Sequence, residues 1–182
     1  MNWLTKSVLP KIKAFVNNKE VKENLWIKCS SCEQMIFSKD LYENLNICTT
    51  CNFHMPFYPK NRLKFLLDDS SLELIDYSSD NQDILNFKDV KKYSERLKVS
   101  KAKTEQDDCI YLVKGRINKF PVVVAAFDFR FMGGSMGKSV GNAFVRGVKV
   151  AIDQKCAFIT IPSSGGARMQ EGIISLMQMP KT

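Results

Sequence analysis

The chain has 182 residues, with 27 Lys and Arg against 19 Asp and Glu, which gives a formal net charge of +8. This length suffices for one domain with an appendage, or for two small domains. The positive charge favours anionic partners such as nucleic acid, phosphorylated cofactors or an acidic protein, but charge alone does not choose among them. No apolar run reaches the roughly 18 residues that a membrane-spanning helix needs, so we expect no membrane segment.

Residues 1–25 mix lysines with scattered apolar side chains and contain no arginine. A secretory signal needs a continuous apolar run of about 7–15 residues, and a transit peptide is rich in arginine and serine. The segment matches neither pattern. We therefore expect a short amphipathic docking arm on a cytoplasmic protein whose thiols are reduced.

Residues 26–55 carry four of the six cysteines in the pattern C-x2-C-x15-C-x2-C. Each pair can form a tight knuckle, and the spacer is long enough for a hairpin that brings the two knuckles together. Four thiolates make a closed tetrahedral site, which is typical of one structural Zn²⁺ ion and leaves no position for a catalytic water. Two disulfides or four unpaired thiols are the alternatives, and a cytoplasmic chain disfavours disulfides. The predicted ligands are Cys29, Cys32, Cys48 and Cys51.

The other candidates for metal binding or nucleophilic chemistry are His54, Cys109 and Cys156. His54 is the only histidine, and it lies three residues past the last ribbon cysteine. Because four cysteines already fill the site, we expect it on or against the ribbon surface. The two remaining cysteines have no histidine base near them and are predicted to be small core residues.

Residues 56–107 are predicted to be a helical and loop connection. A short helix begins at Pro59, with leucines on one side. A mostly polar stretch follows, and "KDVKKYSERLKVSKAKTEQDD" predicts a solvated helix and then a loop. Lysines in such a helix more often form a solvent-exposed face than a binding patch.

Residues 108–182 change to an α/β texture. "CIYLVKGRI" and "PVVVAAFDF" predict a hairpin joined by "NKF", and residues 138–155 show apolar side chains at helical spacing. The strand "AFITIP" and the helix "GGARMQEGIISLMQM" follow. Strand, glycine-rich turn and helix thus occur twice, which predicts parallel strands with crossover helices. The sheet is thin for an enzyme, so we expect a fragment of a longer protein or a chain that relies on a partner.

The first glycine loop, "FMGGSMGKS", looks like a phosphate loop. The pattern G-x-x-x-x-G-K-[ST] would require glycine at position 132, where the chain has Met132. The loop is one residue short, and "AFITIPSSGG" offers no acidic residue for Mg²⁺. The sequence therefore disfavours a nucleotide-binding P-loop.

The second glycine loop, "SSGGARMQEG", also leads into a helical pattern. Two such loops on neighbouring strands could aim backbone N–H donors at one point and stabilise an oxyanion. Tight turns that need positive φ explain the glycines equally well. Arg168 could bind a phosphate or carboxylate, or pair with Glu171, and the residues alone favour the pair. Because the segment has no histidine and no convincing carboxylate pair, an enzyme of this kind would depend on backbone electrostatics and a cofactor.

The chain closely resembles the β subunits of bacterial acetyl-coenzyme A carboxylase carboxyltransferase, over nearly its whole length. The motifs that carry the resemblance are "MNW", "LWIKCSSC", "CTTC", "FMGGSMGKSVGNAFVRG" and "SSGGARMQEGIISLMQM", in this order. The resemblance implies an α/β fold of the crotonase or ClpP type, built of ββα units in a superhelix that is incomplete here. It also implies transfer of a carboxyl group from carboxybiotin, held on a carrier protein, to acetyl-CoA, which gives malonyl-CoA for fatty-acid synthesis.

The resemblance also implies a site. The thioester oxygen becomes negative as an enolate forms, and biotin itself acts as the base. It assigns Ser164 and Arg168 to the substrate, Arg168 alternatively to fixing the loop, and backbone oxyanion donors to Gly133, Gly134, Gly165, Gly166 and Ala167.

The implied partners are a carboxyltransferase α subunit in an α2β2 assembly, the biotin carboxyl carrier protein and biotin carboxylase. Because the family's active site lies between α and β subunits, we expect the truncated chain alone to be inactive. The alternative is a nucleic-acid-binding zinc ribbon on a basic chain. The ribbon lacks the stripe of aromatic and basic residues of a clear nucleic-acid reader, so nucleic acid is at most a secondary partner.

Overall fold

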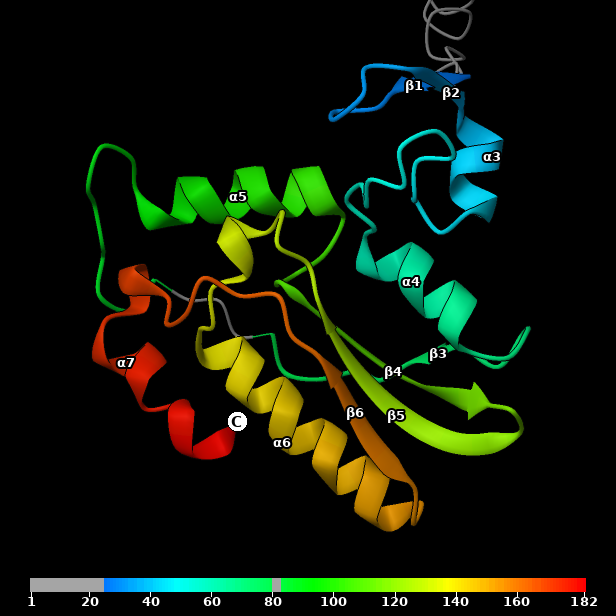
Figure 1. The fold of residues 1–182 in the computed structure, drawn as a ribbon. Helices are drawn as coiled ribbons and strands as arrows, with labels where there is room; N and C mark the ends of the chain where they lie inside the picture. Colours follow the sequence, from blue (N-terminus) through cyan, green and yellow to red (C-terminus); the bar gives the residue numbers. More distant parts are fainter. Residues whose placement is uncertain (1–24, 80–82) are drawn as a thin grey trace, which may run out of the picture. The chain divides into compact units, whose positions relative to one another are not determined.

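A computed structural model of the chain describes residues 25–79 and 83–182 (Figure 1). The chain divides into two compact units, one ending at Phe57 and the other beginning at Tyr58. The predicted docking arm lies outside the described residues, apart from Leu25.

The first unit is a small ribbon. Strands β1 (Trp26–Lys28) and β2 (Met35–Phe37) pair antiparallel, and helix α3 (Ser38–Glu43) follows directly. Its core contains Ile36 and Leu41 beside two of the cysteines. The spacer between the cysteine pairs therefore holds one strand and one helix rather than the expected hairpin. The hairpin instead surrounds the first cysteine pair.

The second unit is built on one four-stranded sheet with the order β3-β4-β5-β6. Strands β4 and β5 form the predicted hairpin around a two-residue turn at Asn118 and Lys119, both at positive φ (48° and 72°). Such turns match the twist of the two strands. The Asp68 carboxylate accepts both turn amides, at 2.9 and 2.7 Å. The strands are β3 (Glu73–Leu74), β4 (Ile110–Ile117), β5 (Phe120–Phe127) and β6 (Ala157–Ile161).

Helix α6 (Lys138–Asp153) connects β5 to β6, and these two strands pair parallel, as predicted for a crossover unit. The other described strand pairs are antiparallel: β4–β5 as expected of the predicted hairpin, and β3–β4, for which no pairing was predicted. A two-residue connection can join only antiparallel neighbours. The result is one strand pair followed by one crossover helix.

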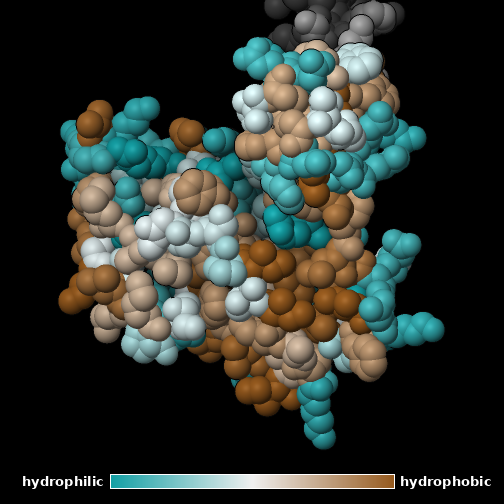
Figure 2. All heavy atoms as spheres, in the orientation of Figure 1, coloured by the Kyte–Doolittle hydropathy of each residue, from teal (hydrophilic) through white to brown (hydrophobic). Residues whose placement is uncertain are grey.

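Helices cover both faces of this sheet (Figure 1). Successive residues of β5 alternate between two cores: Val123 and Ala125 belong to the core that includes α6, and Val122 and Val124 to the core that includes Leu63 of helix α4 (Pro59–Leu66). Because strands buried on both faces need apolar side chains at every position, β5 reads as one continuous apolar run. Figure 2 shows hydrophobic residues gathered over β5 and β6.

Helix α5 (Tyr93–Thr104) confirms the helix predicted in the lysine-rich segment. It is not a fully solvated helix, because Tyr93, Leu97 and Thr104 are buried. These positions lie at intervals of four and seven residues and form one inward face.

The helix predicted after β6 is broken into short pieces. They are the 3₁₀ turns Met169–Glu171 (η2) and Met179–Lys181 (η3), with helix α7 (Ile173–Leu176) between them. Gly172, with φ 50° and ψ −130°, leaves the helical region and separates the first two. A third 3₁₀ turn, η1 (Met132–Gly134), lies in the first glycine loop. Throughout residues 25–79 and 83–182, no helix combines the length and apolarity needed to cross a membrane.

Candidate functional site

The four ribbon cysteines lie on two knuckles of the same geometry. In the first, the Cys29 N–H donates to the Gln34 carbonyl at 2.9 Å, and the Glu33 N–H donates to the Cys29 carbonyl at 3.0 Å. Glu33 has φ 62°, which turns the chain back after the second cysteine of the pair.

The second knuckle repeats this pattern. The Cys48 N–H donates to the Phe53 carbonyl and the Asn52 N–H to the Cys48 carbonyl, both at 2.9 Å, and Asn52 has φ 58°. In each knuckle, backbone N–H groups point at the first sulfur. The Cys51 N–H lowers the pKa of Cys48 to about 6, and the Cys32 N–H lowers the pKa of Cys29. The backbone therefore favours the thiolate form, which a metal binds, at Cys29 and Cys48. Although its own backbone hydrogen bond lowers the pKa of Cys32, burial and hydrogen bonds to the other three sulfurs outweigh that bond and raise the pKa to about 12.

The four sulfurs fit a tetrahedral zinc ion. All lie within 4.8 Å of one another, with Cys29–Cys51 at 3.8 Å and Cys32–Cys48 at 3.7 Å. Zn–S bonds of about 2.3 Å in a tetrahedron place the sulfurs about 3.8 Å apart. A disulfide needs about 2.05 Å, so the disulfide alternative does not hold. The predicted four-cysteine site is confirmed as a cluster, and it has no open position for water.

The structure also shows where the histidine and the two remaining cysteines lie. His54 lies exposed on the ribbon, where its backbone bridges Ile47. Cys109 is buried, and burial raises the pKa of its thiol, while Cys156 is half-buried against the same core. Neither thiol has the environment of a nucleophile.

The described ribbon surface gives little support to recognition of nucleic acid. Lys28 pairs with Glu33 at 2.9 Å, and Lys39 pairs with Glu43 at 3.8 Å. Paired lysines contribute less to the neutralisation of phosphates than free ones.

The structure brings the two glycine loops together. The Gly165 N–H donates to the Gly133 carbonyl at 2.9 Å. The Met136 N–H donates to the Gly166 carbonyl at 2.8 Å, and the Arg168 N–H donates to the Met136 carbonyl at 2.9 Å. Residues about 30 positions apart thus form a short parallel bridge, which holds the loops side by side.

Glycine is required in these loops for two different reasons. Gly133, Gly134 and Gly166 have φ of 67°, 64° and 106°, a region that side chains disfavour. At Gly134 a Cβ would also overlap the Ser163 carbonyl of the other loop. The tight-turn explanation therefore holds for these three glycines, and close contact between the two loops is a further requirement at Gly134.

Two of the predicted oxyanion amides are already engaged. The Gly134 N–H donates to the Phe131 carbonyl, and the Gly165 N–H donates to the Gly133 carbonyl, each at 2.9 Å. Because a backbone N–H has only one proton to donate, these two glycines shape the loops in this structure and do not offer free donors.

The amides of Gly133 and Ala167 have no acceptor within the part of the chain that the structure describes. The Gly166 N–H donates to the Ser164 hydroxyl at 3.1 Å, an acceptor that can rotate away. Free donors therefore come from both loops.

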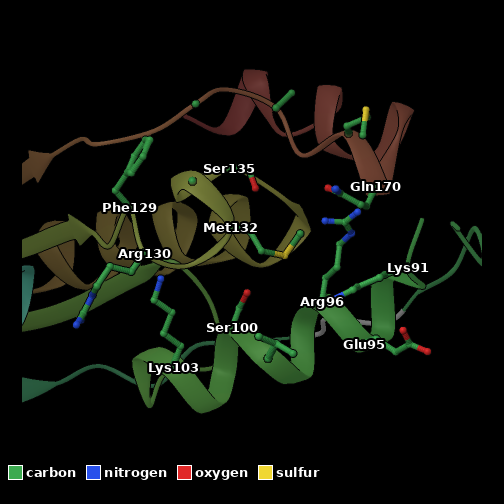
Figure 3. Close-up of a pocket in the computed structure, with 15 residues that line it drawn as sticks. Lys91, Glu95, Arg96, Ser100, Lys103, Phe129, Arg130, Met132, Ser135 and Gln170 are labelled. Carbon is green, nitrogen blue, oxygen red and sulfur yellow. The ribbon is translucent and has the colours of Figure 1, made fainter. Parts of the chain in front are cut away.

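Gly133 and Ala167 both line one cavity of about 710 Å³, and helix α5 forms its opposite wall (Figure 3). Arg96 extends from α5 towards Gln170 in the second loop, and its guanidinium holds Asp89 through two bonds of 2.7 Å. Its buried Nε has no acceptor among the described residues. The cations that line the cavity are Lys91, Arg96, Lys103 and Arg130.

This wall was not predicted from the sequence, because lysines at such spacing on a helix usually form a solvated face. Arg96, Val99, Ser100 and Lys103 all line the cavity, and they recur at intervals of three, four and seven residues. That spacing was the signal for a second functional face on the helix.

The phosphate-loop reading fails on a further observation. The Lys138 N–H at the start of α6 donates to the Glu171 carboxylate at 2.6 Å. A P-loop would offer such amides to phosphate, but here a buried carboxylate of the same chain takes this position.

Arg168 is buried and bonded on every side. Its guanidinium donates to both Asp108 carboxylate oxygens, to Glu171 Oε1 at 3.1 Å, to the Tyr93 hydroxyl at 3.2 Å and to the Ser135 carbonyl at 2.7 Å. Although burial alone would lower its pKa, the Asp108 carboxylate raises the pKa of Arg168 overall. The predicted pair with Glu171 is confirmed. Full burial favours the role of fixing the loop over direct contact with a substrate.

The family model for the carboxyl transferase domain matches residues 80–182, and that for the acetyl-CoA carboxylase zinc finger domain matches residues 26–51. The chain therefore belongs to the carboxyl transferase domain family. Its fold is a partial crotonase-like fold that follows an N-terminal four-cysteine zinc ribbon in the chain, as predicted.

Individual relatives in this family carry a more specific name than the family model does. A protein of Granulibacter bethesdensis named acetyl-coenzyme A carboxylase carboxyl transferase subunit beta is 46% identical over 182 residues, which are 100% of this chain and 59% of that protein. A protein of the same name from Jannaschia sp. is 43% identical, with 100% and 57% covered. The chain thus spans about three fifths of the length of these relatives.

A similar solved structure is transcarboxylase 12S with methylmalonyl-coenzyme A and methylmalonic acid bound. It is 29% identical, has a TM-score of 0.53, and the match covers 68% of this chain and 22% of that one. The predicted family resemblance is confirmed by the family models and by the named relatives.

Proposed function

We propose that the protein is the β subunit of an acetyl-CoA carboxylase carboxyltransferase, which moves a carboxyl group from carboxybiotin to acetyl-CoA and forms malonyl-CoA. The named relatives support this activity, since they carry that subunit name over the whole of this chain. The proposal includes a cytoplasmic enzyme that works with an α subunit in an α2β2 assembly, a biotin carboxyl carrier protein and biotin carboxylase.

The observation that carries the proposal is the free backbone amides of Gly133 and Ala167, on two different loops that line one cavity. An acetyl thioester that loses a methyl proton places negative charge on its oxygen. Two N–H donors aimed at that oxygen stabilise the enolate, and one such donor is worth about 2.7–4 kcal/mol of barrier in other enzymes. Gly166 is a third donor if the Ser164 hydroxyl rotates away.

No side chain in the loops is suited to take the methyl proton. The residues lining the cavity include one carboxylate, Glu95, and no histidine. Biotin, after giving up its carboxyl group, supplies the base in this proposal. The new C–C bond then forms between the enolate carbon and the carboxyl carbon, and the oxygen returns to a neutral thioester carbonyl.

Charge on the α5 wall suits the other end of the substrate. Coenzyme A carries phosphates, and Lys91, Arg96 and Lys103 line the same cavity as the free amides. We propose that these cations bind the anionic part of the substrate.

The zinc site contributes to structure in this proposal. Cys29, Cys32, Cys48 and Cys51 would hold the ion, and four thiolate ligands leave no coordination position for a substrate. Zinc would supply folding energy to the ribbon and no step of the reaction.

The test is the reverse reaction, run with the complete reading frame that encodes this chain and its α subunit. Malonyl-CoA and biocytin should give acetyl-CoA, and omission of biocytin should abolish the product. Absence of turnover with both subunits folded and present would overturn the proposal. We also expect no turnover from the 182-residue chain without the α subunit, because the family's active site lies between the two.

A further inference from the structure

Four ionisable side chains form a buried cluster beside the cavity, which we name the clasp. Tyr93, Asp108 and Arg168 are 0% exposed and Glu171 is 6% exposed. Buried charges are costly unless they are paired and hydrogen-bonded, and every member of the clasp is bonded to another. The proposed chemistry uses none of them directly, so their position must serve something else.

Within the clasp, the second loop holds the first loop at two points. The Arg168 guanidinium donates to the Ser135 carbonyl at 2.7 Å. The Glu171 carboxylate accepts the Lys138 N–H at 2.6 Å, where the first loop becomes α6. Glycine at position 137 is required there, since a Cβ would overlap that carboxylate.

Tyr93 ties helix α5 to both charged residues of the second loop. Its hydroxyl donates to Glu171 Oε1 at 2.7 Å and accepts from Arg168 Nη1 at 3.2 Å. Tyr93 is the first residue of α5, and Arg96 and Lys103 of the same helix line the cavity wall opposite the glycine loops. One phenol oxygen thus connects the cationic wall to the residues that hold the loops together.

We propose that Tyr93 is a positioning residue, whose hydroxyl sets the separation between the α5 wall and the free amides of the glycine loops. The inference rests on the proposed carboxyltransferase function and deepens it. A substrate held at one end by the wall and at the other by the amides reacts well only if the two are correctly spaced. The effect of Tyr93 should therefore appear in the chemical step more than in binding.

Tyr77 provides a matched control. Its hydroxyl donates an internal hydrogen bond, as the Tyr93 hydroxyl does, but to the Ile110 carbonyl at 3.0 Å, and its ring packs against the same core. It contacts neither Arg168 nor Glu171 through any bond found in the described residues. Tyr77→Phe and Tyr93→Phe each remove one oxygen and leave the ring in place.

The experiment measures reverse carboxyl transfer by the assembled enzyme, with malonyl-CoA and biocytin as substrates. Wild type, Tyr93→Phe and Tyr77→Phe are compared at a temperature where thermal unfolding shows all three to be folded. For Tyr93→Phe we expect kcat to fall about tenfold with KM for malonyl-CoA within about twofold, because small misplacements of reacting groups cost rate steeply. For Tyr77→Phe we expect kcat within about twofold of wild type.

Two results would overturn the inference: a Tyr93→Phe kcat equal to that of Tyr77→Phe, or a loss confined to KM. An inactive wild-type enzyme would overturn the proposed function instead, so the two failures are distinguishable. If Tyr93→Phe is too unstable to assay, Ser135→Ala tests the clasp from the first loop, since it removes the hydroxyl that Arg168 Nε contacts at 3.3 Å. A smaller kcat loss at unchanged KM supports the inference there, and an unchanged kcat opposes it.

Discussion

The ribbon and the sheet unit are each stabilised internally by a different kind of contact. In the ribbon, the bonds that define each knuckle join residues a few positions apart, and one ion can hold all four sulfurs. In the sheet unit, the clasp joins Tyr93 and Asp108 to Arg168, 75 and 60 positions later in the chain. The ribbon therefore depends on a local pattern and a metal, and the sheet unit depends on contacts between distant segments.

Removal of zinc should give the largest effect and should stay within the ribbon. Structural zinc contributes about 10–16 kcal/mol to folding in small zinc modules, so Cys48→Ser or a strong chelator should unfold residues 26–55. Amide hydrogen exchange should show loss of protection there and retained protection in β4 and β5. Loss of protection in both units at the same chelator concentration would break the comparison.

Asp108→Asn should be the most damaging single change of charge in the sheet unit. It removes one of the two anionic partners of the fully buried Arg168 guanidinium and leaves only Glu171, and breaking a buried pair costs about 3–5 kcal/mol. Urea unfolding of the purified protein measures the loss. Asp89→Asn is the control, since it also removes the carboxylate partner of an arginine, Arg96, but at a partly exposed pair, and it should change stability far less.

Gly134→Ala and Gly133→Ala should separate close approach from backbone strain. Both positions have positive φ, which costs roughly 1–2 kcal/mol for a side chain. Only at Gly134 would the new methyl meet the other loop, so its loss of stability should reach about 3 kcal/mol. Equal losses in thermal or urea unfolding would mean that the loops are not in close contact.

Arg96→Ala should have the smallest effect, on binding alone. Loss of one charged donor should raise KM for malonyl-CoA about tenfold, with a stronger effect at low salt. Lys98→Ala removes the same charge from the exposed side of α5, away from the cavity, and should leave KM within about twofold. Identical KM values for the two variants would remove the α5 wall from the proposed site.

The success of the sequence predictions follows the range of the contacts involved. The cysteine spacing, the hairpin around Asn118 and helix α6 are local patterns, and the structure has all of them. The helix after the second loop was predicted from apolar spacing, but Gly172 breaks it at φ 50°. Local periodicity does not reveal where a glycine takes up such a conformation.

The candidate site was predicted only in part. The two loops come together as expected, but five equivalent donors reduce to Gly133, Ala167 and the movable pair of Gly166 with Ser164. Which N–H is free depends on acceptors in the other loop, so no motif could supply that distinction. The α5 wall could not be predicted for the same reason, because tertiary contacts set the distance between helix α5 and the loops.

By itself, the sequence determined that this chain has a four-cysteine metal site, a hairpin followed by a crossover helix, and the motifs of the carboxyl transferase family. These features depend on residue type and spacing within short segments. Only the tertiary structure decided that Arg168 is enclosed by Tyr93, Asp108 and Glu171, and which amides remain free. Hydrogen bonds between distant segments form only after the chain has folded, and a backbone donor is available to a substrate only where no such bond has taken it.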